Sequence, residues 1–553
     1  MDSGKILARL LEKRGIEGKA EIAEFLSSRP KKTYDPFLLR HMEEGVDLLL
    51  ETFDRGDMIC IYGDYDADGV TSVCILKTVL SRLTHEDIPY YIPSRFDEGY
   101  GLNKEAIQRM ANMGAKLIIT VDCGSSSHEE VEFAKKLGMD VIVTDHHHVG
   151  ETVPPCILIN PKQEGCSYPF KDLAGCGVAF KLAQAIVRER RLEKKVLNSC
   201  LDLVAIGTIG DIVPLLDENR TMVKYGLEMI NQRSRAGLRV LIEKVFSKKE
   251  KLNSEDVAYS IVPHINAAGR MDQGSIGVEM LLCGEEEKCE NLAMQLVEYN
   301  DERKRIQRET TEECLRLVDE QCSDSPFPIV KAANAHEGII GIVAGKLKDE
   351  LERPVAIVTP SGDILKGSAR SIPGIDVFHL MDAHRDLMEK LGGHQGACGF
   401  SIREENLDLL RRNLRDDILQ MQADAWPEEL LQENMFDMVL AEEEITIELA
   451  RAIEGMEPFG EQNPRPTFLV EGIRLSRQKK LGETGSHCRF TANFPGGSQM
   501  ECILFGQGDK YEALIFGKHP LDMRGKLKVS RWQGVEEIQM TVEELFEVKI
   551  HEH

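Results

Sequence analysis

The stretch MICIYGDYDADG (58–69) joins a short apolar run to three aspartates at alternate positions. The run 58–63 has the length and composition of a buried β-strand, and Asp64, Asp66 and Asp68 follow it directly. Three carboxylates this close together repel one another unless a cation lies between them. Carboxylate oxygens suit hard divalent ions such as Mg²⁺ and Mn²⁺. By itself the stretch could equally be a calcium-binding loop or a solvated turn, so its surroundings have to decide.

The residues around this stretch alternate between strand-like and helical patterns. Apolar strand-like runs recur at 89–94, 116–122 and 140–145, and helical patterns occupy 70–83, 103–113 and 127–137. Strands that alternate with helices of about 10–15 residues predict a parallel sheet with helices on both faces. The first part of the chain is therefore expected to have an α/β fold.

Three more acidic or histidine clusters follow apolar runs. Asp122 closes the run 116–121, Asp145-His146-His147-His148 follows 140–144, and Asp211 ends the apolar pattern LDLVAIGTIG (201–210). Taken singly, an Asp at the end of a strand can be a helix cap or a turn residue. A histidine run can be a solvated loop, and consecutive histidines point in different directions, so at most two are expected to face one site.

The conjunction of the clusters favours a metal centre. Ligands of open α/β sheets gather beyond the carboxyl ends of the strands, where three of these clusters lie and which the fourth can reach. Two divalent ions held by Asp and His can activate water and clamp the oxygens of a phosphoryl group during an in-line displacement. Mn²⁺ fits a mixed carboxylate and imidazole set better than Mg²⁺ does, although both remain candidates.

At this point the sequence resembles a known family. The four segments YGDYDADGVTS (62–72), IITVDCGSS (118–126), VTDHHHVG (143–150) and IGTIGDIVPL (206–215) are similar, in that order, to the motifs of the DHH phosphoesterase superfamily. Four further segments resemble its RecJ branch of single-stranded-DNA-specific exonucleases: PHINAAGRMD (263–272), NDERKRIQ (300–307), KGSARSIPGIDV (366–377) and EKLGGHQGACGFSI (389–402). The resemblance covers nearly the whole chain.

The resemblance implies a set of catalytic residues. It implies Asp66, Asp68, Asp122, His146 and Asp211 as metal ligands, with Asp64 and His147 beside them in the catalytic site. Within that set, His147 is expected to position phosphate. Three residues depart from the family pattern: the third histidine His148, Tyr62 where many members have histidine, and His264 where relatives often have arginine.

The resemblance also implies substrate-binding residues outside the metal centre. Residues 326–430 resemble the DHHA1 domain, in which Gly392, Gly393 and His394 offer exposed backbone N–H groups next to an imidazole. Arg370 can fork onto a phosphate, and Arg270 is expected to contact substrate as well. Without the family context, the Gly-Gly-His segment would be interpreted as a tight turn near a surface arginine.

The C-terminal part of the chain consists of short strand-like segments separated by Gly-rich turns, which predict a small β-barrel in the place of the family's OB-fold. Residues 474–531 carry 11 basic and 5 acidic residues, whereas 404–461 carry 4 basic and 17 acidic residues. A basic segment interleaved with aromatic residues is typical of sequence-tolerant single-strand binding, and Lys526 and Lys528 are candidate contacts.

Length and composition set the outer limits. The 553 residues are enough for three or four domains, and 42% hydrophobic with 29% charged residues is the balance of a folded protein. The expected domains are a helical segment (1–45), a DHH domain (46–280), a connecting helix (281–325), the DHHA1 domain (326–430) and the OB-fold (435–553). Fourteen scattered cysteines without a Cys-x-x-Cys pair indicate reduced thiols in a cytoplasm, and no apolar run is long enough for a membrane span.

The net charge of −25 argues against a nucleic-acid partner only as an average, because binding uses local patches. The resemblance implies a 5′→3′ exonuclease that uses Mn²⁺ or Mg²⁺ to release 5′-mononucleotides from single-stranded DNA in repair and recombination. It implies a monomer that works with a helicase and a single-strand-binding protein. Two alternatives remain at this point: a phosphoesterase of short oligoribonucleotides or dinucleotides, and a non-catalytic binding relative.

Overall fold

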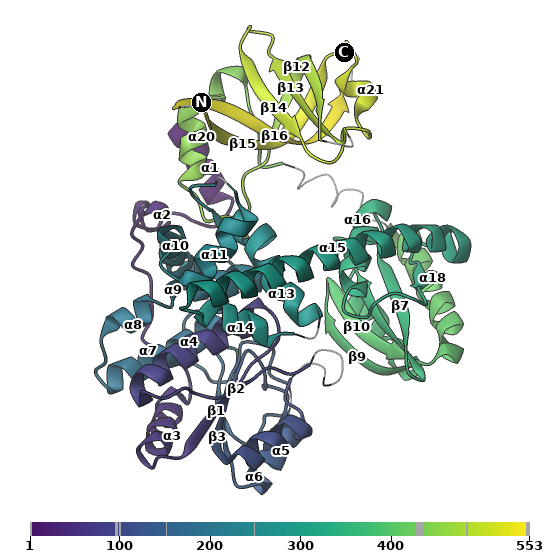
Figure 1. Ribbon diagram of the computed structural model, residues 1–553. Coiled ribbons are helices and arrows are strands. Elements are labelled where there is room, and N and C mark those ends of the chain that lie inside the picture. The colour runs from purple at the N-terminus through teal and green to yellow at the C-terminus, as the bar shows by residue number, and fades with distance from the viewer. Residues whose placement is uncertain are drawn as a thin grey trace.

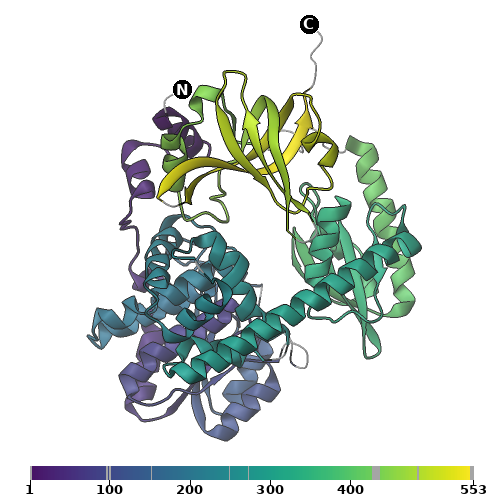
Figure 2. The same ribbon diagram turned by 45° about the horizontal axis from the view of Figure 1, so that its top comes forward.

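The computed structural model describes residues 3–94, 98, 101–150, 152–247, 249–271, 273–425, 436–482, 485–532 and 534–548. The described residues form three bodies (Figure 1). A large α/β lobe and a smaller α/β lobe lie at the two ends of a long helix, and a β-barrel lies above them. Figure 2 shows the barrel facing both lobes across the concave side of this arrangement.

The large lobe contains the predicted parallel sheet. Its strands are β1 (Met58–Tyr62), β2 (Tyr90–Tyr91), β3 (Ala115–Val121), β4 (Asp140–Thr144) and β5 (Ile157–Ile159), all parallel in the order β2-β1-β3-β4-β5. The sequence analysis did not predict β5. The carboxyl ends of β1, β3 and β4 are neighbours, so the residues that follow them share one edge of the sheet.

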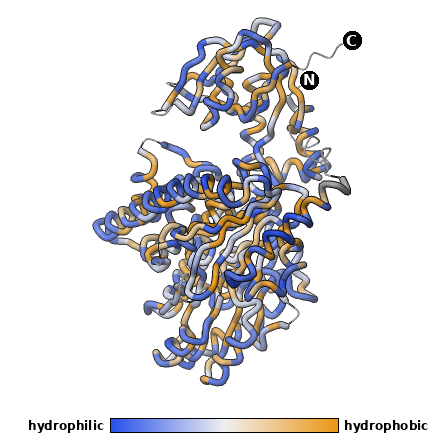
Figure 3. The backbone as a smooth tube through the Cα atoms, turned by 90° about the vertical axis from the view of Figure 1, so that its right-hand side faces the viewer, coloured by the Kyte–Doolittle hydropathy of each residue, from blue (hydrophilic) through white to orange (hydrophobic). Residues whose placement is uncertain are grey.

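Alternate residues of each strand face opposite layers of helices, as expected for a sheet that is buried on both sides. Ile59 and Ile61 pack into one core with the helices α3 (Met42–Asp54), α4 (Ala67–Thr84) and α7 (Gly175–Glu189). Cys60 and Tyr62 pack into the other core with α5 (Lys104–Met113) and α6 (His128–Lys136). Figure 3 shows orange, hydrophobic stretches that run through the interior of the lower part of the molecule.

The remainder of this lobe is helical. Its elements are α8 (Lys194–Asn198), α9 (Leu201–Gly210), α10 (Asp217–Gln232), α11 (Ala236–Val245), α12 (Ser254–Asp256), a π-helical turn (Val257–Ile261), α13 (Val262–Arg270) and α14 (Ser275–Leu282). The apolar pattern before Asp211 is thus the helix α9, which is apolar all round because α4, α7 and α10 surround it.

One uninterrupted helix, α15 (Glu286–Cys322), joins the two lobes, as the Gly- and Pro-free charged pattern predicts. Its 37 residues span roughly 55 Å. Its N-terminal half packs against α11 and α13, and its C-terminal half packs against α16 (Ile340–Leu351) of the smaller lobe.

The smaller lobe is a mixed sheet with helices. The strands β6 (Ile329–Lys331), β7 (Val355–Ser361), β8 (Ile364–Arg370), β9 (Met388–His394) and β10 (Ala397–Ile402) lie in the order β6-β7-β8-β10-β9, and α17 (Val377–Asp382) and α18 (Glu404–Ala425) complete the lobe. Gly392 and Gly393 belong to the edge strand β9 and not to a tight turn. At Gly393 a side chain would collide with the backbone of β10.

The C-terminal body is a closed barrel. Its strands are β12 (Phe468–Leu481), β13 (His487–Asn493), β14 (Gln499–Leu504), β15 (Leu521–Trp532) and β16 (Val535–Glu547), with the short β11 (Met438–Val439) beside β12. The ring closes because β12 pairs with β15 as well as with β13. The helices α20 (Ile447–Glu454) and α21 (Glu512–Ile515) cover its ends.

The N-terminal helices α1 (Ser3–Glu12) and α2 (Lys19–Leu26) share the apolar core of this barrel. Ile6, Leu10 and Leu11 are fully buried there, against Leu449 among others. The first and last parts of the chain therefore form one structural unit, and Figure 2 shows both at the same end of the molecule. Among the described residues no helix combines the length and apolarity that a membrane span needs.

Candidate metal centre and substrate path

The first acidic cluster lies where β1 ends and α4 begins. Asp66 is the N-cap of α4, and its Oδ1 accepts hydrogen bonds from the backbone N–H groups of Asp68 and Gly69, both at 3.0 Å. Asp68 is buried and accepts from the backbone N–H groups of Gly175 at 2.6 Å and Cys176 at 2.9 Å. The positive N-terminus of α7 thus holds one of the predicted ligands in place.

The histidine cluster after β4 is oriented by its first residue, Asp145, which was not among the predicted catalytic residues. Asp145 is 1% exposed and accepts hydrogen bonds from the backbone N–H groups of Ser125 and His146 at 2.8 and 2.7 Å. It also bonds the His147 Nδ1 at 2.7 Å, so that nitrogen carries the proton and Nε2 is left to face outward. His148 is exposed and lies in the loop after β4, outside this network.

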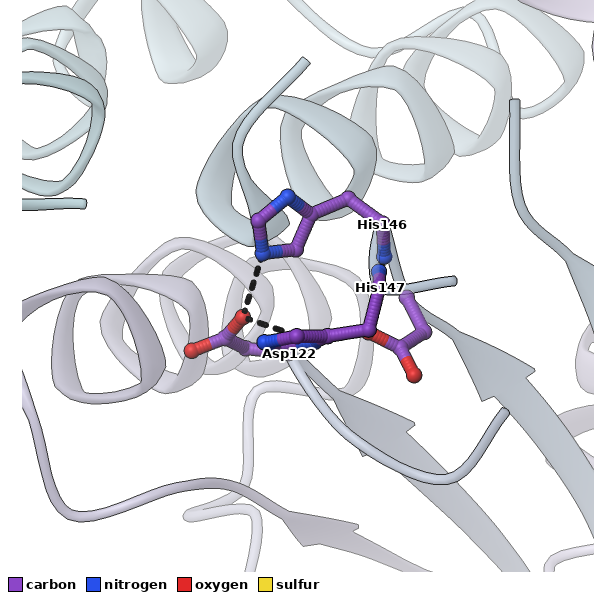
Figure 4. A group of neighbouring side chains, drawn as sticks. Asp122, His146 and His147 are labelled. Carbon is purple, nitrogen blue, oxygen red and sulfur yellow. Dashed lines mark hydrogen bonds and ion pairs between the residues drawn. The ribbon is translucent and has the colours of Figure 1, made fainter. Parts of the chain in front are cut away.

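His146 is the centre of the cluster. Its Nε2 lies 3.2 Å from Asp122 Oδ1, 3.5 Å from Asp211 Oδ2 and 3.9 Å from Asp68 Oδ2. The side chain is 6% exposed, and neither ring nitrogen makes a hydrogen bond. Figure 4 shows the imidazole directed at the Asp122 carboxylate, with His147 on the other side. A buried imidazole without hydrogen bonds, surrounded by carboxylates, fits a divalent cation.

The protonation equilibria of the cluster are strongly displaced. Burial, reinforced by the charges of Asp68 and Asp66, raises the pKa of Asp122 well above its ordinary value and that of Asp211 to about 9. Burial lowers the pKa of His146 to about 4. Burial alone would also raise the pKa of Asp145, but its hydrogen bond to His147 and the His147 charge lower it. The cluster is therefore too rich in negative charge to be ionised without a cation.

Three sets of side chains have donor atoms close enough to share an ion. They are Asp68 with His146 and Asp211, Asp64 with Asp66 and Asp122, and Asp122 with Asp145, His146 and His147. The sets overlap at Asp122 and His146, so neighbouring ions could share ligands. Oxygen donors with one or two imidazoles suit Mn²⁺ or Mg²⁺. All seven predicted catalytic residues thus lie in one place.

The cluster is so closely packed that two glycines are required around it. A Cβ at Gly175 would lie 2.5 Å from Asp122 Oδ1, and one at Gly207 would lie 2.4 Å from Thr71 Oγ1 and 2.7 Å from Asp68 Oδ1. Asn266 of α13 accepts from the Ala67 N–H at 2.7 Å and fixes the start of α4. Gly207 and Asn266 lie inside the motifs quoted above and Gly175 lies outside them, and none of the three could be given a role from the sequence, because only the fold brings their elements to the acids.

Two of the departures from the family pattern lie away from the cluster. The Tyr62 hydroxyl donates to the Gly101 carbonyl at 2.8 Å and accepts from the Asn103 amide at 3.1 Å, on the α5 side of the sheet. His264 is 6% exposed and bonds the Ser260 carbonyl and the Asn300 amide.

The substrate-binding candidates of the smaller lobe lie on one face of its sheet. The register pairs Arg370 with Ala397, and Ala397 with His394, so the side chains of Arg370 and His394 point to the same side from β8 and β9. Gly392 lies in the next row of that face, opposite Gly399. Arg370 also lines a cavity of about 560 Å³ that lies between the lobes, with Tyr65 and Arg270 on its other wall. There Arg270 donates to the Gly338 carbonyl at 2.8 Å.

Lys526 and Lys528 do not lie at the metal cluster. They project from the outer face of β15, where two rows of paired residues cross the barrel. One row is Lys479–Arg489–Ile503–Thr541–Lys526, and the other is Ser476–Thr491–Glu501–Gln539–Lys528. Lys526 pairs with Glu543 at 2.7 Å, whereas the Lys528 pKa is lowered by burial and then by nearby Arg465.

Several cavities lie between this barrel face and the residues beside the metal cluster. A cavity of about 800 Å³ covers the Lys479 end of the rows, and one of about 920 Å³ covers Lys526 and Lys528. The second shares Tyr259, Arg465 and Lys526 with a third cavity of about 480 Å³, which Gly210 and Asn266 line beside the metal cluster. Arg270 belongs to this third cavity and to the cavity of Arg370.

Comparison with known proteins agrees with this architecture. The family model described as the DHH family N-terminal domain matches residues 58–208, the DHHA1 domain matches 325–419, and the RecJ OB domain matches 436–544. The solved structure of RecJ from Thermus thermophilus in complex with Mn²⁺ superposes with a TM-score of 0.80 at 28% identity, covering 98% of this chain and 76% of that one. A structure of exonuclease RecJ bound to manganese is 31% identical, with a TM-score of 0.60, over 71% of this chain and 97% of that one.

Curated relatives match along nearly the entire chain. The single-stranded-DNA-specific exonuclease RecJ of Bacillus subtilis (strain 168) is 36% identical over 98% of this chain and 67% of its own length. The protein of the same name from Dickeya dadantii (strain 3937) is 34% identical over 98% of this chain and 96% of its own length. With this identity over both lengths, and with all three domains present in order, the chain belongs to the RecJ family of DHH phosphoesterases.

Proposed function

We propose that this protein is a metal-dependent exonuclease that hydrolyses single-stranded DNA from the 5′ end to 5′-mononucleotides. The observation that carries the proposal is the group of cavities that extends from the basic barrel face to residues next to the Asp/His cluster, such as Gly210 beside Asp211. A substrate of two to five nucleotides would not need that path. The relatives named above are single-stranded-DNA-specific exonucleases.

The metal ligands in this proposal are Asp66, Asp68, Asp122, His146 and Asp211. Two Mn²⁺ or Mg²⁺ ions held there would supply an activated water and would neutralise charge on the scissile phosphate. The residues of the chain set the geometry. Asp145 fixes the orientation of the His147 ring, which would position a phosphate oxygen, and α7 holds Asp68 through two backbone N–H groups.

The 5′→3′ direction of hydrolysis follows from the place where the 5′ end of a bound strand can lie. The cavity of Arg370 shares Arg270 and Ile342 with the third cavity of the path, and Tyr65, which lies between Asp64 and Asp66, lines it as well. Guanidinium groups bind phosphate bidentately, so a terminal 5′-phosphate would be held there with one nucleotide reaching back to the metals. His394 and Gly392 border the same sheet face, with Gly393 between them on β9, and the missing side chain of Gly392 lets the backbone of the DNA strand approach closely.

The path toward the barrel suits a strand of any sequence. Tyr259, on the π-helical turn, is 82% exposed and lines two adjoining cavities, where its ring can stack on a base. Lys526 and Lys528 lie along the same path and would contact phosphates. Of the barrel aromatics, Phe490, Phe494 and Tyr511 are buried in its core, while Phe505 is 53% exposed.

The domain division and cellular setting belong to the same proposal. We divide the chain into a helical segment (1–45), the DHH domain (46–280), the connecting helix (281–325), the DHHA1 domain (326–430) and the OB-fold (435–553). The separate apolar cores of the two lobes and the barrel support the division between these three domains, whereas α1 and α2 of the helical segment share the barrel core. All 14 cysteines are free thiols, which supports a cytoplasmic protein. We propose a monomer that acts in repair and recombination on strands supplied by a helicase and a single-strand-binding protein.

The test uses 5′-labelled oligomers with Mn²⁺. Single-stranded DNA, duplex DNA and RNA of equal length are incubated with the protein and with its Asp66→Ala and Asp122→Ala variants. We expect labelled mononucleotide from single-stranded DNA alone, and none with either variant. Release of label only from short RNA, or label that stays in long products while the 3′ end shortens, would contradict the proposal.

A further inference from the structure

Arg303 lies near the middle of α15 and has no role in the function proposed above. Its side chain lines the cavity of about 480 Å³ beside the metal cluster. The same cavity is lined by Gly210, which precedes Asp211, and by Asn266, which holds the start of α4. Arg303 therefore faces the stretch of the substrate path between the metals and the barrel.

A chain of hydrogen bonds fixes this side chain. His264 Nδ1 lies 2.5 Å from the Ser260 carbonyl, so it must carry the proton and donate. The His264 Nε2 is then an acceptor, and the Asn300 amide donates to it at 3.1 Å. The remaining Asn300 oxygen accepts from Arg303 Nε at 3.0 Å, and the Gln307 oxygen accepts from Arg303 Nη1, also at 3.0 Å. The Ser260 carbonyl thus determines which atom donates and which accepts in each hydrogen bond of this series.

The surroundings of Arg303 differ from those of its neighbours on the helix. Arg305 pairs with Glu302 at 2.6 Å and with Glu309 at 2.7 Å, and Lys304 pairs with Asp301 at 3.4 Å. Within the described part of the chain, no carboxylate lies within ion-pair distance of Arg303, whose partners are neutral amide oxygens. Burial lowers its pKa without an opposing carboxylate. A half-buried guanidinium without a nearby anion costs desolvation free energy, unless a ligand supplies the anion.

We propose that Arg303 binds a phosphate of the single strand, on the barrel side of the scissile phosphate. The inference rests on the proposed function and names a binding group within it. The free Nη2 and part of Nη1 can form charge-assisted bonds to the phosphate oxygens. His264, Asn300 and Gln307 are positioning residues, because they hold the guanidinium in the cavity without contacting the substrate themselves.

The first test compares Arg303→Gln with Arg308→Gln, which removes an exposed arginine of the same helix outside the cavities. Dissociation constants for a 20-nucleotide strand are measured in EDTA, where no cleavage occurs, over a range of salt concentrations. We expect Arg303→Gln to raise Kd roughly ten- to hundredfold, the effect of one charge-assisted contact. The slope of log Kd against log salt should fall by about 0.7, the value for one phosphate on a single strand, and Arg308→Gln should change neither quantity.

The second test places the phosphate. A 5′-phosphorylated dinucleotide has no phosphate beyond the scissile one, whereas a trinucleotide has one. We expect the loss in kcat/KM of Arg303→Gln to be at least tenfold larger for the trinucleotide, and Arg303→Lys to recover part of it. An equal loss on both substrates, or an unchanged salt slope, would overturn the role of Arg303. If the wild-type protein does not degrade single-stranded DNA with Mn²⁺, the proposed function itself has failed.

Discussion

The backbone at Gly207 lies so close to the proposed metal ligand Asp68 that no side chain fits between them. Gly207 lies in α9, and its missing side chain makes room for Thr71, Cys176 and Asp68. Gly345 of α16 is also helical, but a Cβ there would meet nothing within 4 Å. The two glycines therefore form a matched pair, in which the same change has opposite consequences.

We predict that Gly207→Ala displaces Asp68 and lowers kcat/KM roughly hundredfold, the effect of moving a catalytic group by about 1 Å. It should also destabilise the fold by about 1–3 kcal/mol through overpacking. Gly345→Ala should keep full activity and gain about 0.5–1 kcal/mol, as expected for a glycine inside a helix. Nuclease assays and urea unfolding measure both. A Gly207→Ala protein with normal activity would show that the site can relax around the extra methyl group.

His264 gives a prediction about pH. Burial lowers its pKa below 6.5, because a proton on Nε2 would be desolvated and would face the Asn300 amide. The unfolded chain thus takes up a proton near pH 6.5 while the folded protein does not. The stability that His264 contributes is present above pH 6.5 and is lost as the pH falls toward its folded pKa. We expect His264→Gln to unfold with a flatter pH dependence than wild type between pH 7 and 5 in thermal melts. An identical dependence would mean that His264 is protonated in the fold.

Among individual residues, the sequence predicted the candidate metal ligands better than the residues that hold them in place. Asp64, Asp122 and His146 each end or follow an apolar strand, and parallel strands bring their carboxyl ends together. Asp145 follows β4 in the same way, whereas Gly175 and Asn266 support the site from helices whose positions depend on how they pack on the sheet. No spacing in the sequence encodes that packing.

Among the elements, β15 carries the candidate contacts to long strands. Lys526 and Lys528 lie in adjacent rows of the outer barrel face, but only Lys526 has a close carboxylate partner. A cation that is already paired contributes less to phosphate binding than one that is not. We therefore predict that Lys528→Glu weakens binding of a 20-nucleotide strand more than Lys526→Glu does, by roughly tenfold, and lowers the salt dependence.

The control for these substitutions is Lys518→Glu, which reverses an exposed charge in the same basic segment away from the rows. Fluorescence anisotropy at several salt concentrations measures all three variants. The substitutions should lower kcat/KM for a dinucleotide by a smaller factor than they raise Kd for the 20-nucleotide strand. Equal effects of Lys518→Glu and Lys528→Glu would show that only the overall charge of the barrel matters.

Element order was predictable where one periodicity dominates. The charged, Gly-free run at 285–320 became α15, and the alternating runs of the first lobe became its parallel strands. The strand β9 was missed because Gly392 and Gly393 have low strand propensity, and it forms only because β10 pairs with it. The packing of α1 inside the barrel core joins residues more than 400 positions apart, which local patterns cannot indicate.

For the molecule as a whole, Arg220 of α10 holds three distant parts of the chain together. It is 3% exposed and donates to the Phe25 carbonyl at 3.0 and 3.1 Å, to Glu457 at 2.8 Å and to Pro458 at 3.4 Å. Its guanidinium also lies 3.7 Å from the centre of the Phe25 ring. Three parts of the chain therefore meet at one buried side chain. They are the N-terminal helix α2, the segment that leads into the barrel, and the catalytic lobe.

We predict that Arg220→Met lowers the stability of the protein and its affinity for long strands much more than it lowers the rate of hydrolysis. The variant leaves the Glu457 carbonyl without its donor and the Phe25 carbonyl with only the Lys224 ammonium at 3.4 Å, which should cost roughly 3 kcal/mol in urea unfolding. Because the barrel then loses its fixed position over the substrate path, Kd for a 20-nucleotide strand should rise at least tenfold, while kcat/KM for a dinucleotide falls much less. Arg316→Met, on the exposed side of α15, is the matched control and should change neither. If Arg220→Met bound long strands normally after a clear loss of stability, the barrel would be held in place by its other contacts, and the continuity of the path would not depend on this junction.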